Sequence, residues 1–87
     1  MARAARGLTK SLHLPEHRAL CDLLTTTRRK AGLTQQVVAK RLKRPQSFVA
    51  KYEGGERRLD LIEFIAVAEA LAADPVKLMR AFLKRIR

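Results

Sequence analysis

Apolar side chains recur along this chain at the three- and four-residue spacing of amphipathic helices. Pro15 suits the first position of a helix, and Leu20, Leu24 and Ala31 follow it at that spacing. Gly32 then supplies a residue that readily adopts the left-handed conformation at a helix end. The pattern predicts a helix that begins at Pro15 and is closed by Gly32.

Two shorter helices are predicted next, with a tight turn between them. Thr34 can accept a hydrogen bond from the free amides of a helix that spans Thr34 to Leu42. Pro45 is another residue suited to a first turn, and it opens a helix from Pro45 to Glu53 that two glycines end. Each of these helices has only about two turns.

The last two helices have clear starting signals. Asp60 and Glu63 have the spacing of a capping box and open a helix that runs through Leu71. Apolar residues nearly encircle that helix, so we expect it to be central to the core. Asp74 and Pro75 then cap and start a fifth helix. Its apolar stripe consists of Val76, Met79, Phe82, Leu83 and Ile86.

No segment alternates apolar and polar residues for long enough to indicate a strand. The predicted fold is therefore all-α, a compact bundle of five helices. We expect a basic, flexible N-terminal arm at residues 1–14, with a targeting segment as the alternative, and one domain at residues 15–87. A single domain is what 87 residues allow.

The high positive charge of the chain indicates that this helical bundle has a polyanionic partner. The chain carries 19 Lys and Arg against 8 Asp and Glu, a net charge of +11, which favours nucleic acid or an anionic membrane surface. Residues 28–58, which include both short helices, hold ten basic and two acidic residues. The longest apolar stretch, residues 61–73, is shorter than the roughly 20 residues that cross a bilayer and contains two glutamates. We expect no membrane partner.

The sequence gives little support for catalysis or for metal binding. Cys21 is the lone cysteine, and with His13 and His17 it makes too few donors for a structural zinc site. No Ser-His-Asp set, phosphate-binding glycine loop or plausible carboxylate pair can be assembled. We therefore expect no enzyme, no metal and no other cofactor.

Two short helices joined by a tight turn are the arrangement of a helix-turn-helix. An α-helix fits the major groove of B-DNA, so side chains near the start of the second helix can reach base edges. Gln46, Ser47 and Lys51 are the candidates, because Gln can bond adenine, Ser can donate or accept, and Lys can reach guanine or a phosphate. For Phe48, packing on a thymine methyl and packing in the core remain alternatives.

The motif also resembles a known family, the phage-repressor and Cro type of helix-turn-helix regulators, over about residues 33–79. The matching positions are Leu33-Thr34-Gln35, Ala39, Leu42, Gln46-Ser47, Val49, Tyr52-Glu53, the Gly55-Glu56-Arg57-Arg58 loop, Ala68 and Leu71. The resemblance implies that Gln35 bonds a phosphate, and that Gln46, Ser47 and Lys51 face the bases. It also implies that Arg57 and Arg58 hold the DNA backbone.

Other basic residues flank this motif. Lys43 and Arg44 lie in the turn beside the second helix, so we expect phosphate contacts there, with simple solvation as the alternative. The first helix ends with Arg28, Arg29 and Lys30, where positive charge suits the helix dipole, with contact to a phosphate as the alternative.

Two residues depart from the family pattern. Lys43 stands where the family usually has Gly, in a left-handed position that costs a non-Gly residue about 1–2 kcal/mol. Pro45 stands where Ser or Thr is usual, so the second helix lacks the usual side-chain cap and its start can shift by one residue.

These observations predict a sequence-specific regulator of transcription in the bacterial cytoplasm. We expect a repressor that binds a pseudo-palindromic double-stranded DNA operator as a homodimer. The dimer contact is expected at Met79, Phe82, Leu83 and Ile86, the alternative being that this stripe packs on the fourth helix. RNA polymerase is a further candidate partner. Two other functions remain open, a DNA-binding antitoxin that binds a toxin and a protein-binding anti-activator.

Overall fold

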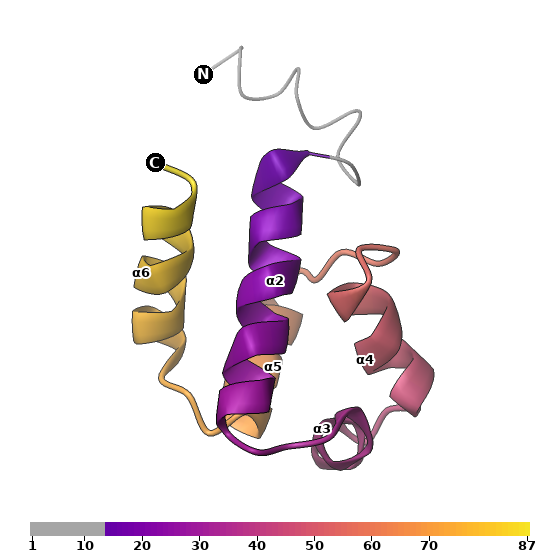
Figure 1. The fold of residues 1–87 in the computed structure, drawn as a ribbon. Coiled ribbons are helices and arrows are strands. Elements are labelled where there is room, and N and C mark those ends of the chain that lie inside the picture. Colours follow the sequence, from indigo (N-terminus) through magenta and orange to yellow (C-terminus); the bar gives the residue numbers. More distant parts are fainter. Residues whose placement is uncertain (1–13) are drawn as a thin grey trace.

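The computed structural model describes residues 14–87, so the predicted N-terminal arm lies almost wholly outside the described residues. The chain forms five α-helices in this part: α2 (Pro15–Lys30), α3 (Gln35–Leu42), α4 (Gln46–Glu53), α5 (Leu61–Ala70) and α6 (Pro75–Arg85). In Figure 1, α2 runs through the middle of the bundle, with α6 on one side, α3 and α4 on the other, and α5 behind it. The predicted all-α fold is confirmed. None of the helices among residues 14–87 is long and apolar enough to cross a membrane.

Most helix starts follow the predicted capping residues. The Thr34 side chain accepts a hydrogen bond from the backbone N–H of Val37 at 3.1 Å. Asp60 and Glu63 form a reciprocal capping box at the start of α5, with distances of 2.7 and 3.0 Å. Asp74 caps α6. These short polar side chains satisfy amides that the first turn of a helix leaves without partners.

The turn between α3 and α4 keeps the expected shape although it contains no glycine. Lys43 is left-handed, with φ 57° and ψ 41°, and the N–H of the next residue, Arg44, donates to the carbonyl of Ala39 at 3.0 Å. Pro45 is extended and precedes the helix, so α4 begins at Gln46 and not at Pro45 as predicted. Pro45 provides no side-chain cap, because its ring has no hydrogen-bonding atom.

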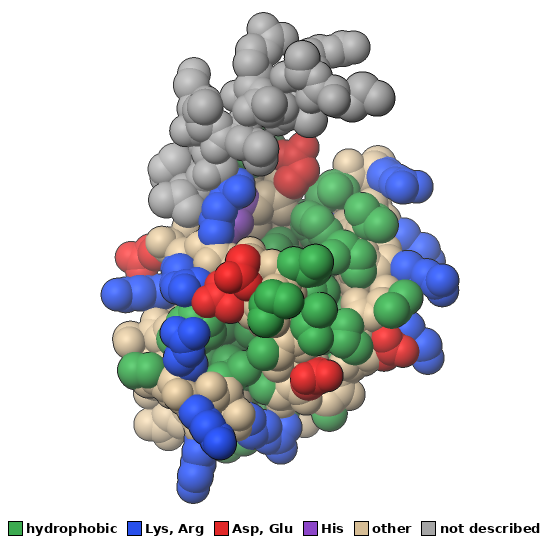
Figure 2. All heavy atoms as spheres, turned by 180° about the vertical axis from the view of Figure 1, so that it is seen from behind, with side chains coloured by type: hydrophobic (Ala, Val, Ile, Leu, Met, Phe, Trp, Pro, Cys, Tyr) green, Lys and Arg blue, Asp and Glu red, His purple; other side chains and the backbone are tan. Residues whose placement is uncertain are grey.

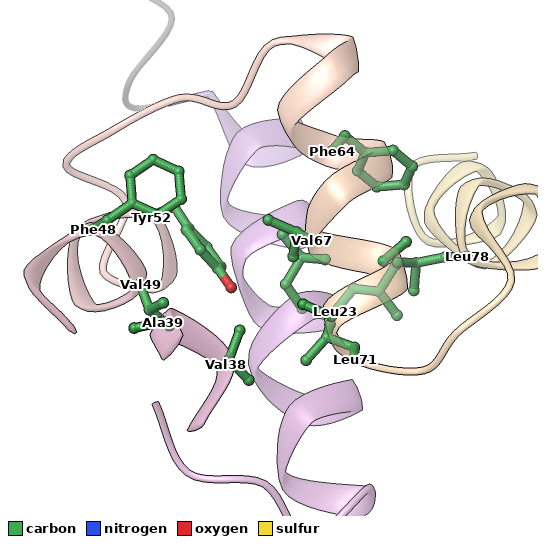
Figure 3. Packing of buried hydrophobic residues seen from close by; sticks show 13 residues of the cluster. Leu23, Val38, Ala39, Phe48, Val49, Tyr52, Phe64, Val67, Leu71 and Leu78 are labelled. Atoms are coloured by element: carbon green, nitrogen blue, oxygen red, sulfur yellow. The ribbon is translucent and has the colours of Figure 1, made fainter. Parts of the chain in front are cut away.

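The core lies where α2, α3, α4 and α5 meet, and Figure 3 shows side chains from these helices pointing toward one another. Tyr52, Leu24, Val38, Val49 and Val67 are its largest almost completely buried apolar side chains. Leu78 adds the contribution of α6. Burial of apolar surface at this junction fixes the position of α3 and α4 relative to the rest of the bundle.

The expectation that α5 is central to the core holds for only one of its faces. Phe64 and Val67 face the core, whereas Leu61 and Ile62 are 63% and 74% exposed and Ile65 is also exposed. The reason is geometric, since α3 and α6 pack against α5 but leave the side that carries Leu61 and Ile62 uncovered. An apolar face of α5 therefore remains at the surface.

Replacing Lys43 with Gly should stabilise the fold. The change removes about 1–2 kcal/mol of left-handed strain, and the greater freedom of Gly in the unfolded chain offsets about 0.5–1 kcal/mol of that. Urea denaturation should show a net gain of about 0.5–1 kcal/mol in the free energy of unfolding. Lys43→Ala removes the same charge and keeps the strain, so an equal gain in that variant would contradict the explanation.

Candidate nucleic-acid interface

The second helix of the motif, α4, has one buried face and one exposed face. Val49 and Tyr52 are buried in the core, whereas Gln46, Ser47 and Lys51 are all exposed. The structure thus brings the three predicted base-contacting residues together on one accessible surface. Two of them lie in the first turn of α4, the part of a recognition helix that reaches base edges most directly.

Gln46 is held by a second glutamine. The Nε2 of Gln46 lies 3.4 Å from the Oε1 of Gln35, at the start of α3. Gln35 is half-buried and donates in turn from its own Nε2 to the Oε1 of Glu53 at 2.9 Å. Two adjacent helices are thereby joined through side-chain amides.

Glu53 is the residue that sequence reasoning missed. Its carboxylate accepts from the Nε of Arg28 at 2.7 Å and from the Nη2 of Arg28 at 3.0 Å, and the two side chains are only 6% and 10% exposed. Arg28 also donates to the carbonyl of Leu33 at 2.8 Å. A pairing across 25 residues leaves no local pattern that could have revealed it.

This pairing decides the role of Arg28. The hydrogen bonds to Glu53 raise the pKa of Arg28 above its ordinary value, and its donors point into the protein. Arg28 therefore acts within the fold, and the alternative of a phosphate contact is not supported. The chain of contacts from Arg28 through Glu53 and Gln35 ends at Gln46, on the exposed surface.

Phe48 lies in the core and not on the exposed face of α4. Its side chain is 8% exposed, and its ring packs edge-on against Tyr52 with the centroids 5.5 Å apart. The guanidinium carbons of Arg44 and Arg57 lie 4.8 and 4.7 Å from the same ring centroid. Of the two alternatives for Phe48, the structure shows packing in the core. Because Tyr52, Arg44 and Arg57 cover the ring, it is not available for contact with a base.

The carboxylate of Glu63 lies close to both Arg44 and Arg57. Arg57 donates from Nη1 and Nη2 to the two oxygens of Glu63 at 3.0 and 2.8 Å, and the Nη2 of Arg44 lies 3.8 Å from Oε2. The hydrogen bonds from Arg57 hold the pKa of the Glu63 carboxyl below its ordinary value. We refer to Glu63, Arg57, Arg44 and Phe48 as the Glu63 cluster.

The remaining predicted phosphate contacts lie elsewhere. Lys43 is exposed at the turn before α4. Arg58 lines a shallow depression with Glu16, His17 and Phe82, on the side where α2 begins. The structure therefore brings Arg44 and Arg57 together at Glu63. It does not bring all of the predicted phosphate-contacting residues into one group.

The predicted dimer stripe is only partly accessible. Met79, Phe82 and Leu83 are half-buried, and the first two pack against the core cluster. Ile86, at the end of α6, is 37% exposed.

A second apolar surface, which shares Met79 with this stripe, is more exposed. It is formed by Leu61, Ile65, Val76 and Met79 from α5 and α6, and we call these four residues the α5/α6 patch. Figure 2 shows apolar side chains gathered into a continuous area on the face that includes α5.

Known proteins share both the motif and the fold. A family model described as a helix-turn-helix domain matches residues 19–82. A solved structure of an XRE-family like protein from Pseudomonas syringae pv. tomato str. DC3000 is 43% identical, with a TM-score of 0.80 over 93% of this chain and 99% of that chain. The chain belongs to the XRE family of helix-turn-helix regulators. No curated protein matches the sequence.

Other structures show how widely this XRE-family fold is shared. The restriction-modification controller protein C.AhdI from Aeromonas hydrophila is 26% identical, with a TM-score of 0.69 over 75% of this chain and 98% of that chain. The controller protein C.Esp1396I, solved as a tetramer with its natural 35 base-pair operator, is 16% identical. Its TM-score is 0.78 over 85% of this chain and 97% of that chain, which shows a shared fold.

Replacing Arg28 with Met in this XRE-family chain should lower the free energy of unfolding by about 3–5 kcal/mol, because it leaves the Glu53 carboxylate buried without its partner. Thermal and urea unfolding measure the loss. Arg29→Met is the matched control, since Arg29 is the exposed neighbour and should change stability by less than about 0.5 kcal/mol. Equal effects of the two substitutions would show that the buried pair is not responsible.

Proposed function

We propose that this protein is a sequence-specific regulator of transcription, a repressor that binds double-stranded DNA as a homodimer in the bacterial cytoplasm. One observation carries the proposal: Gln46, Ser47 and Lys51 form the exposed face of α4, the second helix of a helix-turn-helix. An α-helix fits the major groove. The net charge of +11 supplies attraction to the phosphate backbone, which does not depend on sequence.

The hydrogen bonds of Gln46 leave it able to recognise a base. Its Nε2 carries two hydrogens, of which one is directed toward Gln35, and its Oε1 remains an acceptor. An amide with one donor and one acceptor can pair with the N7 and N6 atoms of adenine. Contact with Gln35 reduces the number of orientations of Gln46, so less conformational freedom is lost when DNA binds.

Gln35 can contact a phosphate at the same time. One Nε2 hydrogen bonds Glu53, and the second is available to a phosphate oxygen near the start of α3. Lys43 extends from the turn beside α4 and adds a positive charge next to the groove. Such contacts position the protein on the duplex, while the three side chains on α4 read the sequence.

The proposed dimer forms through the α5/α6 patch. The lining of this surface is mostly apolar, with Arg80 at its border, so two copies can bury apolar side chains against each other there. A two-fold dimer that reads two half-sites places its two α4 helices in successive major grooves about 34 Å apart. The operator-bound tetramer of C.Esp1396I supports assembly as a property of this fold. A dimer seated on a promoter would repress by excluding polymerase.

Binding-site selection from random duplex DNA, followed by footprinting at near-physiological salt, tests the proposal. We expect enrichment of a sequence with two related half-sites and protection over both. Weak, salt-sensitive binding with no enriched sequence would reject a sequence-specific regulator.

Replacing Gln46 with Ala should cost about 1–3 kcal/mol in operator binding and relax the preference at one base pair in each half-site. Lys43→Gln is the comparison, because it should weaken binding to all duplexes alike and reduce the salt slope by about 0.9. Filter binding or fluorescence anisotropy on single-base operator variants measures both. If neither substitution changed operator binding, the proposed docking of α4 would be incorrect.

Replacing Val76 with Glu should shift the protein from dimer to monomer, because it places two charges in an apolar contact. Sedimentation velocity measures the shift, and a single half-site should still be bound. Ile86→Glu is the matched control, at the residue that follows α6 and outside the α5/α6 patch. If only Ile86→Glu gave monomers, the originally predicted stripe would be the interface instead.

A further inference from the structure

We propose that Glu63 occupies a phosphate-binding site formed by Arg44 and Arg57, and that a DNA phosphate competes with this carboxylate for the two arginines. The proposal rests on the proposed function, since it concerns how tightly the backbone is held. It assigns to Glu63 a role in DNA affinity that its place in a capping box does not require.

The geometry of the pair is that of a carboxylate standing in for a phosphate. Arg57 presents both terminal nitrogens to the two oxygens of Glu63 at 3.0 and 2.8 Å. Arginine binds carboxylate and phosphate with the same two-pronged arrangement of N–H donors. Arg44 approaches the same carboxylate at 3.8 Å, so two positive charges converge on one anion.

Both arginines remain open to solvent. The side chains of Arg44 and Arg57 are 49% and 36% exposed, while that of Glu63 is 18% exposed. A phosphate can therefore approach the outer edges of the guanidinium groups. Ion pairs that are open to solvent contribute little to stability, so exchange of Glu63 for a phosphate is energetically feasible.

Phe48 keeps the arginines in place during such an exchange. Both guanidinium carbons lie within 4.8 Å of its ring centroid, a cation–π distance that attracts each of them independently of Glu63. Phe48 belongs to the first turn of α4, and Arg44 lies two residues before that helix. The Glu63 cluster thus borders the surface that carries the proposed base contacts.

The consequence is a limit on backbone attraction. While Glu63 is ionised, it neutralises part of the positive charge of Arg57 and Arg44 and lowers affinity for any duplex. Because the cluster contains none of the three side chains proposed to read bases, its effect should be the same for every sequence. Glu63 therefore sets the strength of DNA binding and not the preferred sequence.

Glu63→Gln tests this role without removing the capping box, because Gln at that position can also accept from the backbone N–H of Asp60. Affinities for the selected operator and for an unrelated duplex are measured over a series of salt concentrations. We expect both to increase by similar factors, and the salt slope to become steeper by about 0.9 for each additional phosphate that the arginines neutralise.

Glu69→Gln is the matched control. It removes the same charge from an exposed position on the same helix, outside the Glu63 cluster, and should have a smaller effect on both affinities. If Glu63→Gln bound no more tightly than Glu69→Gln, or more weakly than the unsubstituted protein, the competition would be refuted.

A second measurement separates this inference from the proposed function. Absence of DNA binding by the unsubstituted protein would reject the proposed function, but inorganic phosphate can still be titrated while the guanidinium NMR signals of Arg44 and Arg57 are followed. We expect Glu63→Gln to saturate at a lower phosphate concentration than Glu69→Gln and the unsubstituted protein. Identical titrations in all three would overturn the inference.

Discussion

The buried ion pair between Arg28 and Glu53 is the interaction on which the arrangement of the motif depends. Two charges removed from water must have partners, and here each can find them only if the ends of α2 and α4 lie together. Arg28 also binds the carbonyl of Leu33, which fixes the connection to α3. A shift of α4 relative to α2 would leave both charges unpaired in the interior.

The same pair connects the interior to the surface that we propose contacts DNA. Glu53 accepts a hydrogen bond from the amide of Gln35, and the side-chain oxygen of Gln35 accepts one from Gln46. A residue proposed to read bases is therefore oriented by a group that is itself fixed by the core. This arrangement favours recognition because side chains held in position before binding lose less entropy on binding.

The surface divides into regions with different chemistry. Around α4, positive charge is partly balanced by Glu63, whereas the α5/α6 patch presents apolar side chains. Apolar contact suits a second copy of a strongly charged chain, and charged contact suits the DNA backbone. The separation lets dimer formation and DNA binding occupy different faces.

The sequence alone determined the helices and their order, because local signals such as Thr34, the Asp60 capping box and the apolar spacing act within a few residues. It also identified the helix-turn-helix and its exposed residues, Gln46 among them. Tertiary structure decided what depends on distant residues: the pairing of Arg28 with Glu53, the burial of Phe48 and the exposed side of α5. Periodicity shows that a residue is apolar and on which side of a helix it lies, but only the packed neighbours decide whether that side is covered.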